Sequence, residues 1–411
     1  MHILLFIFYS LLCGIAIVKI PFIRKSGLRP VLLLLLFALH VVIGLAHNLI
    51  AYRYYPDHGD IWDYFWNSFI YRHRLGSDFS AFLADNASWA HFSHNGMIFI
   101  QMILSFFSFD HLGINTLLFS FPVFLGNIAL FRVFRDRFPN DPLTALTVFL
   151  LPSTLFWTSC IHREGVLYML LGFLLLSIHR MMTAGYRTGG LWRSIVSLLL
   201  IFYFRSGFAL TLAPAIFVWW YLEKPPFRPL LARIAFGITG TLLLSILAFP
   251  GLHIPAVLAG WQKEFYALYG HSRLPLPEMD GSWSGLFRVL PAAFLNGLFE
   301  PLPGSGGQPI YLAFSIELLA IWAVALLALL RTRLKAPFSI FCILFSVAGM
   351  LAIGLFVPFA GAIVRYRSIY LLFLLAPCLH AIANLGPLRQ LNGWLSRHVY
   401  RRSRLTSPTT E

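Results

Sequence analysis

Long apolar runs separated by short polar stretches dominate the pattern of hydrophobic and polar positions in this chain. A transmembrane helix needs about 20 predominantly apolar residues, and most of these runs approach that length. The pattern therefore predicts an all-α protein, a polytopic bundle of transmembrane helices with about 9–12 membrane segments. The runs span approximately residues 3–20, 31–50, 97–107, 113–131, 143–161, 166–182, 194–204, 207–222, 230–249, 309–330, 338–357 and 368–385.

Three of the runs are short for an upright span. We expect 97–107 to form a re-entrant or interfacial helix, and 194–204 with 207–222 to form a pair that enters the membrane and returns. Arg205 favours the pair, because an arginine at mid-bilayer costs about 2.5–3.5 kcal/mol on insertion scales. At a junction that lines a wet cavity most of that cost disappears. If the pair is instead one long helix, the later topology inverts.

Composition supports the same class of protein. The chain of 411 residues is 58% hydrophobic and 11% charged, and its mean hydropathy is +0.75, as in an integral membrane protein. Its net charge of +15 is spread over short loops, so it does not indicate nucleic acid as a partner. All four cysteines lie in or beside apolar runs at no metal-ligand spacing, and we expect buried thiols and no disulfide. They are Cys13, Cys160, Cys342 and Cys378.

The basic residues predict the orientation in the membrane. Short loops rich in Lys and Arg usually face the cytoplasm, which places 21 of the 31 basic and 4 of the 16 acidic residues on that side. The cytoplasmic side then carries +17 and the other side −2. Because the first apolar run is followed by its basic cluster, we expect a retained helix with its N-terminus outside. The clusters lie at 24–29, 132–137, 180–193, 224–233, 331–335 and 389–404.

Two external segments interrupt the predicted transmembrane domain, residues 1–386. Segment 51–96 is rich in aromatic residues and histidine, which indicates helices lying along the membrane interface. Segment 250–308 carries seven prolines and a glycine-rich run at 303–307. Residues 387–411 form a basic cytoplasmic tail, for which we expect an interfacial helix on anionic lipid and then a disordered end.

Three aspartates follow the second apolar run, in the segment PDHGDIWDYF (56–65). The chain has only 16 acidic residues, so Asp57, Asp60 and Asp63 are a concentration of charge beside a membrane. One interpretation is a solvated loop, and the other is a site. A carboxylate there could act as a general base or bind a metal such as Mg²⁺ or Mn²⁺, although no ligand set is indicated. We select Asp57 and Asp60 as candidate catalytic residues.

Further polar residues are isolated within apolar sequence and fall mostly on the predicted outer side. Arginine binds phosphate through a planar, bidentate fork, so these positions suit a lipid-linked anion. A turn or a set of interfacial anchors is the alternative. The Walker A, GxGxxG, HExxH and nucleophile-elbow patterns of soluble enzymes are missing from the sequence. The candidate substrate-binding residues are His162, Arg163, Glu164, Arg205, Glu317, Arg365 and Arg367.

In layout the chain resembles polytopic glycosyltransferases of the GT-C superfamily over most of its length. Segment FWTSCIHRE (156–164) is similar to a helix connection in membrane proteins of bacterial exopolysaccharide clusters, as are FRVLPAAFLNGLFEPLP (287–303) and SIELL (315–319). The resemblance implies that an acidic residue of the first external loop, Asp57 or Asp60, serves as base or metal ligand. The family's usual adjacent acidic pair is absent, since two residues separate these aspartates.

This resemblance implies a glycosyltransferase of the inner (cytoplasmic) membrane. It would move a sugar from a polyprenyl-phosphate carrier to an acceptor at the outer face, in the synthesis of cell-surface polysaccharide. Its expected partners are the lipid-linked donor and membrane lipids, without nucleic acid. An O-antigen-type polymerase or ligase, and a transporter or flippase of lipid-linked saccharide, are the alternatives. Broken helices would suit a transporter, but the sequence shows no internal repeat.

Overall fold

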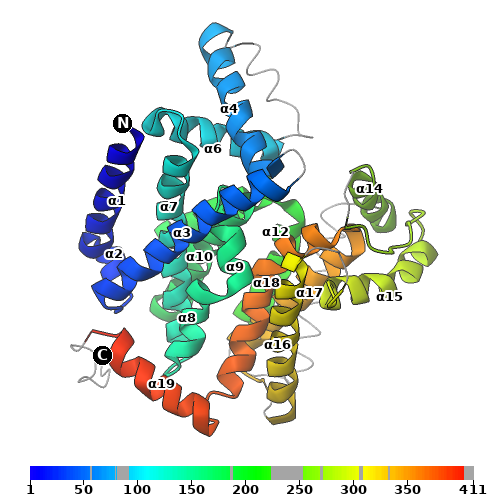
Figure 1. The fold of residues 1–411 in the computed structure, drawn as a ribbon. Helices are drawn as coiled ribbons and strands as arrows, with labels where there is room; N and C mark the ends of the chain where they lie inside the picture. The colour runs from blue at the N-terminus through cyan, green and yellow to red at the C-terminus, as the bar shows by residue number, and fades with distance from the viewer. Residues whose placement is uncertain are drawn as a thin grey trace. The chain divides into compact units, whose positions relative to one another are not determined.

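The computed structural model describes residues 1–55, 58–78, 80, 92–185, 188–223, 253–268, 272–304, 309–331 and 334–401. Within these residues the chain forms 17 helices and no strand (Figure 1). The prediction of an all-α protein is confirmed. The described residues also form two isolated β-bridges, one between Leu28 and Tyr400 and one between Arg273 and Phe359.

The chain divides into two compact units. Unit 1 comprises Met1–Ser206 and Leu385–Glu411, and unit 2 comprises Gly207–Asn384. The helices of unit 1 are α1 (His2–Lys19), α2 (Pro21–Arg24), α3 (Pro30–Tyr54), α4 (Gly59–Ser77), α6 (Phe92–Ser108), α7 (Leu112–Arg137), α8 (Pro142–Leu150), α9 (Pro152–Thr158), α10 (Arg163–Ala184), α11 (Thr188–Phe204) and α19 (Gly386–Val399). Those of unit 2 are α12 (Ser206–Leu222), α14 (Ile254–Tyr266), α15 (Trp283–Phe299), α16 (Pro309–Arg331), α17 (Pro337–Phe356) and α18 (Ala360–Ala381).

Among the described residues, seven helices are long and apolar enough to cross a membrane: α1, α3, α7, α10, α16, α17 and α18. The two shorter apolar helices are α11 and α12. The number of about 9–12 membrane segments stays a prediction, because these two helices are shorter than a candidate span. The apolar run 230–249 lies outside the described residues. The chain is therefore a multi-pass membrane protein by the length and composition of its helices.

The predicted span 143–161 is wrong as a single segment. It forms two short helices, α8 and α9, which meet where Leu151 has an extended conformation before Pro152. Proline has no N–H to donate and disfavours a helical conformation in the residue before it, so it ends α8 and opens α9. Neither half is long enough to span a bilayer.

The predicted break between the two short apolar runs is confirmed. Helix α11 ends at Phe204 and α12 begins at Ser206, so Arg205 lies between them. The short run at 97–107 is part of the longer helix α6, which packs against α4 and α7.

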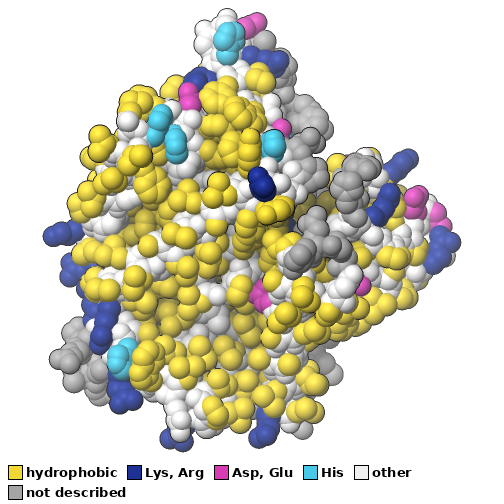
Figure 2. Space-filling model, viewed as in Figure 1, with side chains coloured by type: hydrophobic (Ala, Val, Ile, Leu, Met, Phe, Trp, Pro, Cys, Tyr) yellow, Lys and Arg dark blue, Asp and Glu magenta, His cyan; other side chains and the backbone are white. Residues whose placement is uncertain are grey.

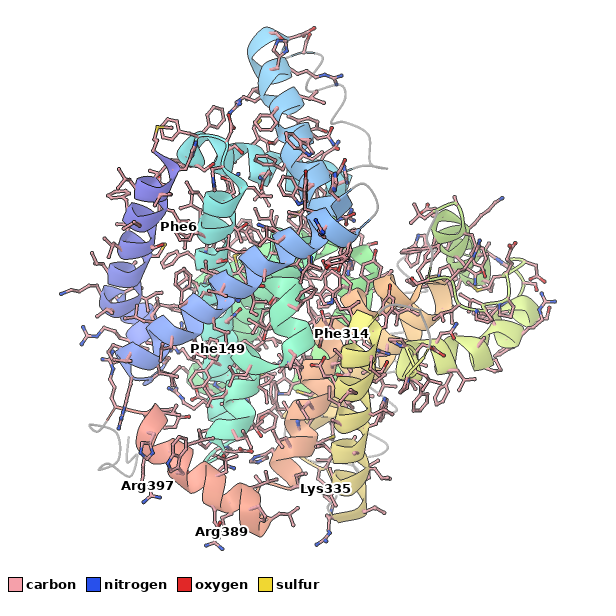
Figure 3. The ribbon with its side chains drawn as sticks, in the orientation of Figure 1. Phe6, Phe149, Phe314, Lys335, Arg389 and Arg397 are labelled. Carbon is pink, nitrogen blue, oxygen red and sulfur yellow. The ribbon has the colours of Figure 1, made fainter. Side chains whose placement is uncertain are left out.

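Helix α7 is the centre of unit 1. It packs against α1, α3, α6, α8 and α10. The ring of Phe149 in α8, labelled in Figure 3, lies at a tilt against the Phe124 and Phe131 rings of α7. Helices α7 and α10 approach so closely that a Cβ on Gly172 would overlap the carbonyl oxygen of Gly126. Close backbone approach at small residues is the usual packing of helices in membranes.

In unit 2, α17 packs against α15 and α18, and α16 packs against α18. Helices α15 and α17 approach each other closely, and a Cβ on Gly354 would overlap the carbonyl oxygen of Ala293. Figure 3 shows Phe314 near the start of α16 and Lys335 beyond its other end. The charge of Lys335 thus lies outside the apolar helix.

The C-terminal helix α19 packs against the rest of unit 1. The Asn392 side chain accepts a hydrogen bond from the Leu143 backbone N at 3.0 Å, and Arg29 Nη2 donates to the Arg397 carbonyl oxygen at 2.8 Å. Arg389 and Arg397 project away from this helix (Figure 3). In Figure 2, hydrophobic side chains cover the visible face over α1 and α3, while basic side chains gather around α2 and α19. This surface suits lipid beside the spans and anionic headgroups at their basic end.

Thiol labelling is expected to reproduce the predicted orientation. Single cysteines replacing the exposed residues His58 or Asp280 should react with a membrane-impermeant thiol reagent in intact cells. Cysteines replacing Lys335 or Arg389 should react only after permeabilisation. The native thiols are buried, so the wild-type chain is the unlabelled control. If cysteines at positions 58 and 389 react from the same side of the membrane, the predicted topology is overturned.

Candidate functional site

Polar residues of unit 1 converge on the connection between α9 and α10. The backbone N of His162 donates to the carbonyl oxygen of Cys160 at 2.7 Å, and α10 begins at the next residue, Arg163. This tight turn directs neighbouring side chains to different surroundings. His162 and Glu164 are buried, while Arg163 is half-buried.

A buried ion pair joins the start of α10 to the break between α11 and α12. Arg205 Nη2 donates to Glu164 Oε1 at 2.8 Å, and the side chains are 19% and 1% exposed. A carboxylate this deeply buried requires a partner, and the positive N-terminus of α10 favours it further. The arginine predicted to bind a substrate phosphate therefore has an internal carboxylate as partner.

Arg163 contacts α4, which lies in the predicted external segment 51–96. Its Nε donates to the hydroxyl of Tyr64 at 3.4 Å, and the Tyr64 ring packs edge-to-face against His94 of α6. Helix α4 is fixed at its far end by Arg72, which makes two hydrogen bonds of 2.7 and 2.8 Å to Asp110. These bonds raise the pKa of the Arg72 guanidinium, so this clamp keeps its charge.

An aspartate–histidine pair lies next to Tyr64, the hydrogen-bond partner of Arg163. His94 Nε2 is 3.1 Å from Asp63 Oδ2, and both side chains are partly exposed. Asn67 Nδ2 also donates to Asp63 Oδ1 at 2.8 Å. Asp60 lies one turn earlier on the same face of α4 and is half-buried. Asp57 lies outside the described residues.

His94 and His47 were not among the predicted site residues, and Tyr64 was considered only as one of the aromatic residues around the aspartates. His94 and Asp63 come from separate helices, and His47 lies inside an apolar run, where a histidine has no distinctive spacing. His47 nevertheless lies beside His162, with ring centroids 5.3 Å apart. The surplus of histidine and aromatic residues in segment 51–96 is the one sequence signal that pointed to this region.

The remaining predicted site residues lie in unit 2. Arg367 is 1% exposed, and its Nη1 donates to the Gly297 carbonyl oxygen of α15 at 3.1 Å. Its acidic electrostatic neighbours include Glu317 and Glu300. Arg365 is half-buried, with its guanidinium 5.7 Å from the ring centre of Tyr366.

The last predicted apolar run, 368–385, begins after both arginines, and this boundary is wrong as the start of a helix. Helix α18 begins at Ala360, so Arg365 and Arg367 lie within it. The preceding stretch is apolar as well, and Phe359 in extended conformation marks the start of the helix. The predicted site residues thus form two groups, one in each unit.

No protein-family model matches the chain, and comparisons with curated proteins and with solved structures give no match either. Fold and site together define an all-α, multi-pass membrane protein with charged and titratable side chains gathered at the helix ends of unit 1.

Proposed function

We propose that this protein is a GT-C-like membrane glycosyltransferase that uses a polyprenyl-phosphate-linked sugar at the outer face of the membrane. The observation that carries the proposal is the convergence in unit 1 of Arg163, Asp60 and the Asp63–His94 pair, from three different helices. A cation beside acid–base groups at the mouth of apolar helices suits a lipid-linked phosphate and a sugar hydroxyl.

The proposed reaction needs two kinds of group. Arg163 would bind the donor phosphate, with Tyr64 orienting its guanidinium. A carboxylate of α4 would take the proton of the acceptor hydroxyl. The acceptor oxygen then bonds to the anomeric carbon, the bond from that carbon to the phosphate oxygen breaks, and polyprenyl phosphate leaves with the electron pair. The α4 carboxylates are also ligands that Mg²⁺ or Mn²⁺ would accept.

The buried ion pair has a supporting role in this proposal. Glu164 neutralises Arg205 within the protein, and it is the residue directly after Arg163. The pair would therefore fix the first turn of α10 and with it the position of the phosphate-binding arginine.

A reconstituted transfer assay tests the proposal. The purified chain in proteoliposomes would receive a panel of radiolabelled polyprenyl-phosphate sugars together with saccharide acceptors, with and without EDTA. We expect label to move to an acceptor with release of polyprenyl phosphate. Broken helices also occur in transporters, so lipid translocation is measured in parallel. Movement of intact donor across the bilayer without cleavage would overturn the transferase in favour of a flippase.

Arg365 provides a test of phosphate recognition in unit 2. If it binds the donor phosphate, its planar fork matters, and Arg365→Lys should impair transfer nearly as much as Arg365→Ala. A charge-assisted hydrogen bond contributes about 1.5–3 kcal/mol, so donor affinity should fall about 10–150-fold, and excess donor should partly restore the rate. Arg389→Lys on the exposed surface of α19 is the control. Wild-type activity of Arg365→Lys at limiting donor would identify an interfacial anchor, since lysine also snorkels.

A further inference from the structure

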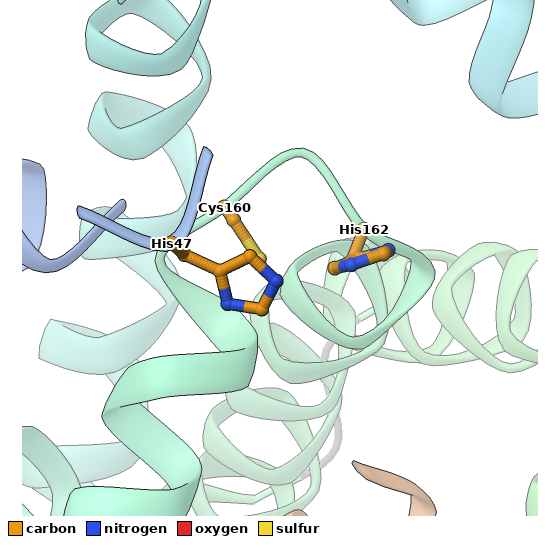
Figure 4. A group of neighbouring side chains, drawn as sticks. All are labelled: His47, Cys160 and His162. Atoms are coloured by element: carbon orange, nitrogen blue, oxygen red, sulfur yellow. The ribbon is translucent and has the colours of Figure 1, made fainter. Parts of the chain in front are cut away.

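Three metal-ligating side chains meet inside unit 1. They are His47 of α3 and, from the connection between α9 and α10, Cys160 and His162 (Figure 4). One potential ligand atom from each residue lies within 4.8 Å of those of the other two. All three side chains are buried, with exposures of 0%, 0% and 2%. A cluster of this composition is unusual between apolar helices and has the chemistry of a metal site.

The backbone around the cluster is held in place by packing. Gly44 lies one turn before His47, and a Cβ there would overlap the carbonyl oxygen of Ser159. Helix α3 thus touches the connection directly. The Asn48 side chain donates to the hydroxyl of Thr116 of α7 at 2.7 Å. This contact and the glycine approach fix His47 against the connection, so the ligand positions are preorganised.

The distances are close to those that a bound ion requires. Metal–nitrogen bonds of about 2.0–2.1 Å and a metal–sulfur bond of about 2.3 Å place tetrahedral ligand atoms about 3.3–3.6 Å apart. Atoms at the 4.8 Å limit would therefore have to approach by about 1.2–1.5 Å. The Cys160 sulfur makes long contacts to the carbonyl oxygens of Phe156 and Trp157, at 3.8 and 3.6 Å. A metal–thiolate bond would readily replace these weak interactions.

Ligand type selects the ion. One thiolate with two imidazoles favours a borderline d¹⁰ cation, whereas Mg²⁺ and Mn²⁺ prefer oxygen ligands. The rings of Phe156, Trp157 and Tyr55 pack around His47 at centroid distances of 4.2, 5.0 and 6.2 Å. This apolar surrounding excludes water and strengthens metal–ligand bonds.

We propose that His47, Cys160 and His162 bind a Zn²⁺ ion that ties α3 to the connection between α9 and α10. The ion would have three protein ligands and one further tetrahedral position. Its position directly before Arg163 gives it a structural consequence: it would fix the turn from which the first residues of α10 project. The proposal concerns the ion alone and holds whatever reaction the protein performs.

Metal analysis of the purified full-length chain in detergent tests the site. We expect about one Zn²⁺ per chain, because the three ligand residues form one cluster. After removal with a chelator, Co²⁺ serves as a spectroscopic probe, because a tetrahedral thiolate site gives intense visible bands and a sulfur-to-metal charge-transfer band. Cys160→Ser should abolish the charge-transfer band, and His47→Gln and His162→Gln should each reduce bound metal. Cys342→Ser, a buried cysteine of unit 2, is the matched control and should change nothing.

Three results would overturn the proposal. Wild-type protein without metal and without a Co²⁺ spectrum would exclude the site. Undiminished Zn²⁺ in the Cys160→Ser variant would place the ion elsewhere. Stoichiometric copper in place of zinc would refute the assignment of the ion. If the serine variant is not recovered folded, the two histidine variants decide, since glutamine keeps the polarity and approximate volume of each imidazole.

Discussion

Arg205→Ala is expected to destabilise unit 1 by about 3–5 kcal/mol, because it leaves a buried carboxylate without its partner. Glu164 is 1% exposed and accepts from Arg205 at 2.8 Å. Its charge cannot be hydrated in place, so the helix junction has to open or the carboxyl has to take up a proton. Unfolding in detergent, followed through the reaction of buried cysteines with a fluorescent thiol reagent, measures the loss.

Two comparisons make this result specific. A double variant with Glu164→Gln and Arg205→Ala also removes the charge of the buried carboxylate. It should recover most of the lost stability, since a neutral amide is less costly to bury. Arg288→Ala removes an ion pair to Asp280 whose side chains are 62% and 52% exposed, and it should cause no measurable change. Equal effects of Arg205→Ala and Arg288→Ala would show that the buried pair does not hold unit 1 together.

Asp60→Asn and Asp57→Asn are expected to abolish sugar transfer while protein level and membrane insertion stay normal. Loss of an essential general base costs about 10²–10⁴-fold in rate. Asp63→Asn should matter less on the sequence argument, because that residue lies one turn further along α4. The structure adds a comparison, since Asp63 pairs with His94. If this pair supplies the base, Asp63→Asn and His94→Gln will both lower the rate of sugar transfer. Asp60→Asn will then leave that rate unchanged.

The matched control for these variants is Asp280→Asn. This aspartate also lies in a predicted external segment, is exposed, and accepts from Ser282 and Arg288. It should leave transfer unchanged. Near-normal output from a chain that carries both Asp57→Asn and Asp60→Asn would identify the acidic cluster as a solvated loop and remove the proposed base.

Local free energies explain which parts of the fold were predictable. The break at Arg205 follows from the cost of one charge in a bilayer, and it was located correctly. Pro152 is an equally local signal, but the continuous apolar sequence around it was interpreted as a single span. The start of α18 was placed too late because the arginines were taken as its boundary. Helix hydrogen bonds and the pairing of Arg367 inside unit 2 accommodate that charge instead.

The candidate site was predictable as a list of residues and not as an arrangement. Sequence placed Arg163, Glu164 and Arg205 among isolated polar positions, yet it assigned all of them to a substrate. In the structure Glu164 and Arg205 form an ion pair, and Arg163 donates a hydrogen bond to Tyr64. His47 was missed because a buried histidine in an apolar helix has no pattern of its own.

The sequence by itself determined the class of this protein. The transfer of each apolar run from water to lipid depends on that run alone, so runs of spanning length define a multi-pass, all-α chain before any helix meets another. Only the tertiary structure decided which polar groups are partners. Glu164 and Arg205 are 41 positions apart, and Arg163 and Tyr64 are 99 apart. Contacts over such separations arise from helix packing, which no local pattern of hydrophobic and polar positions encodes.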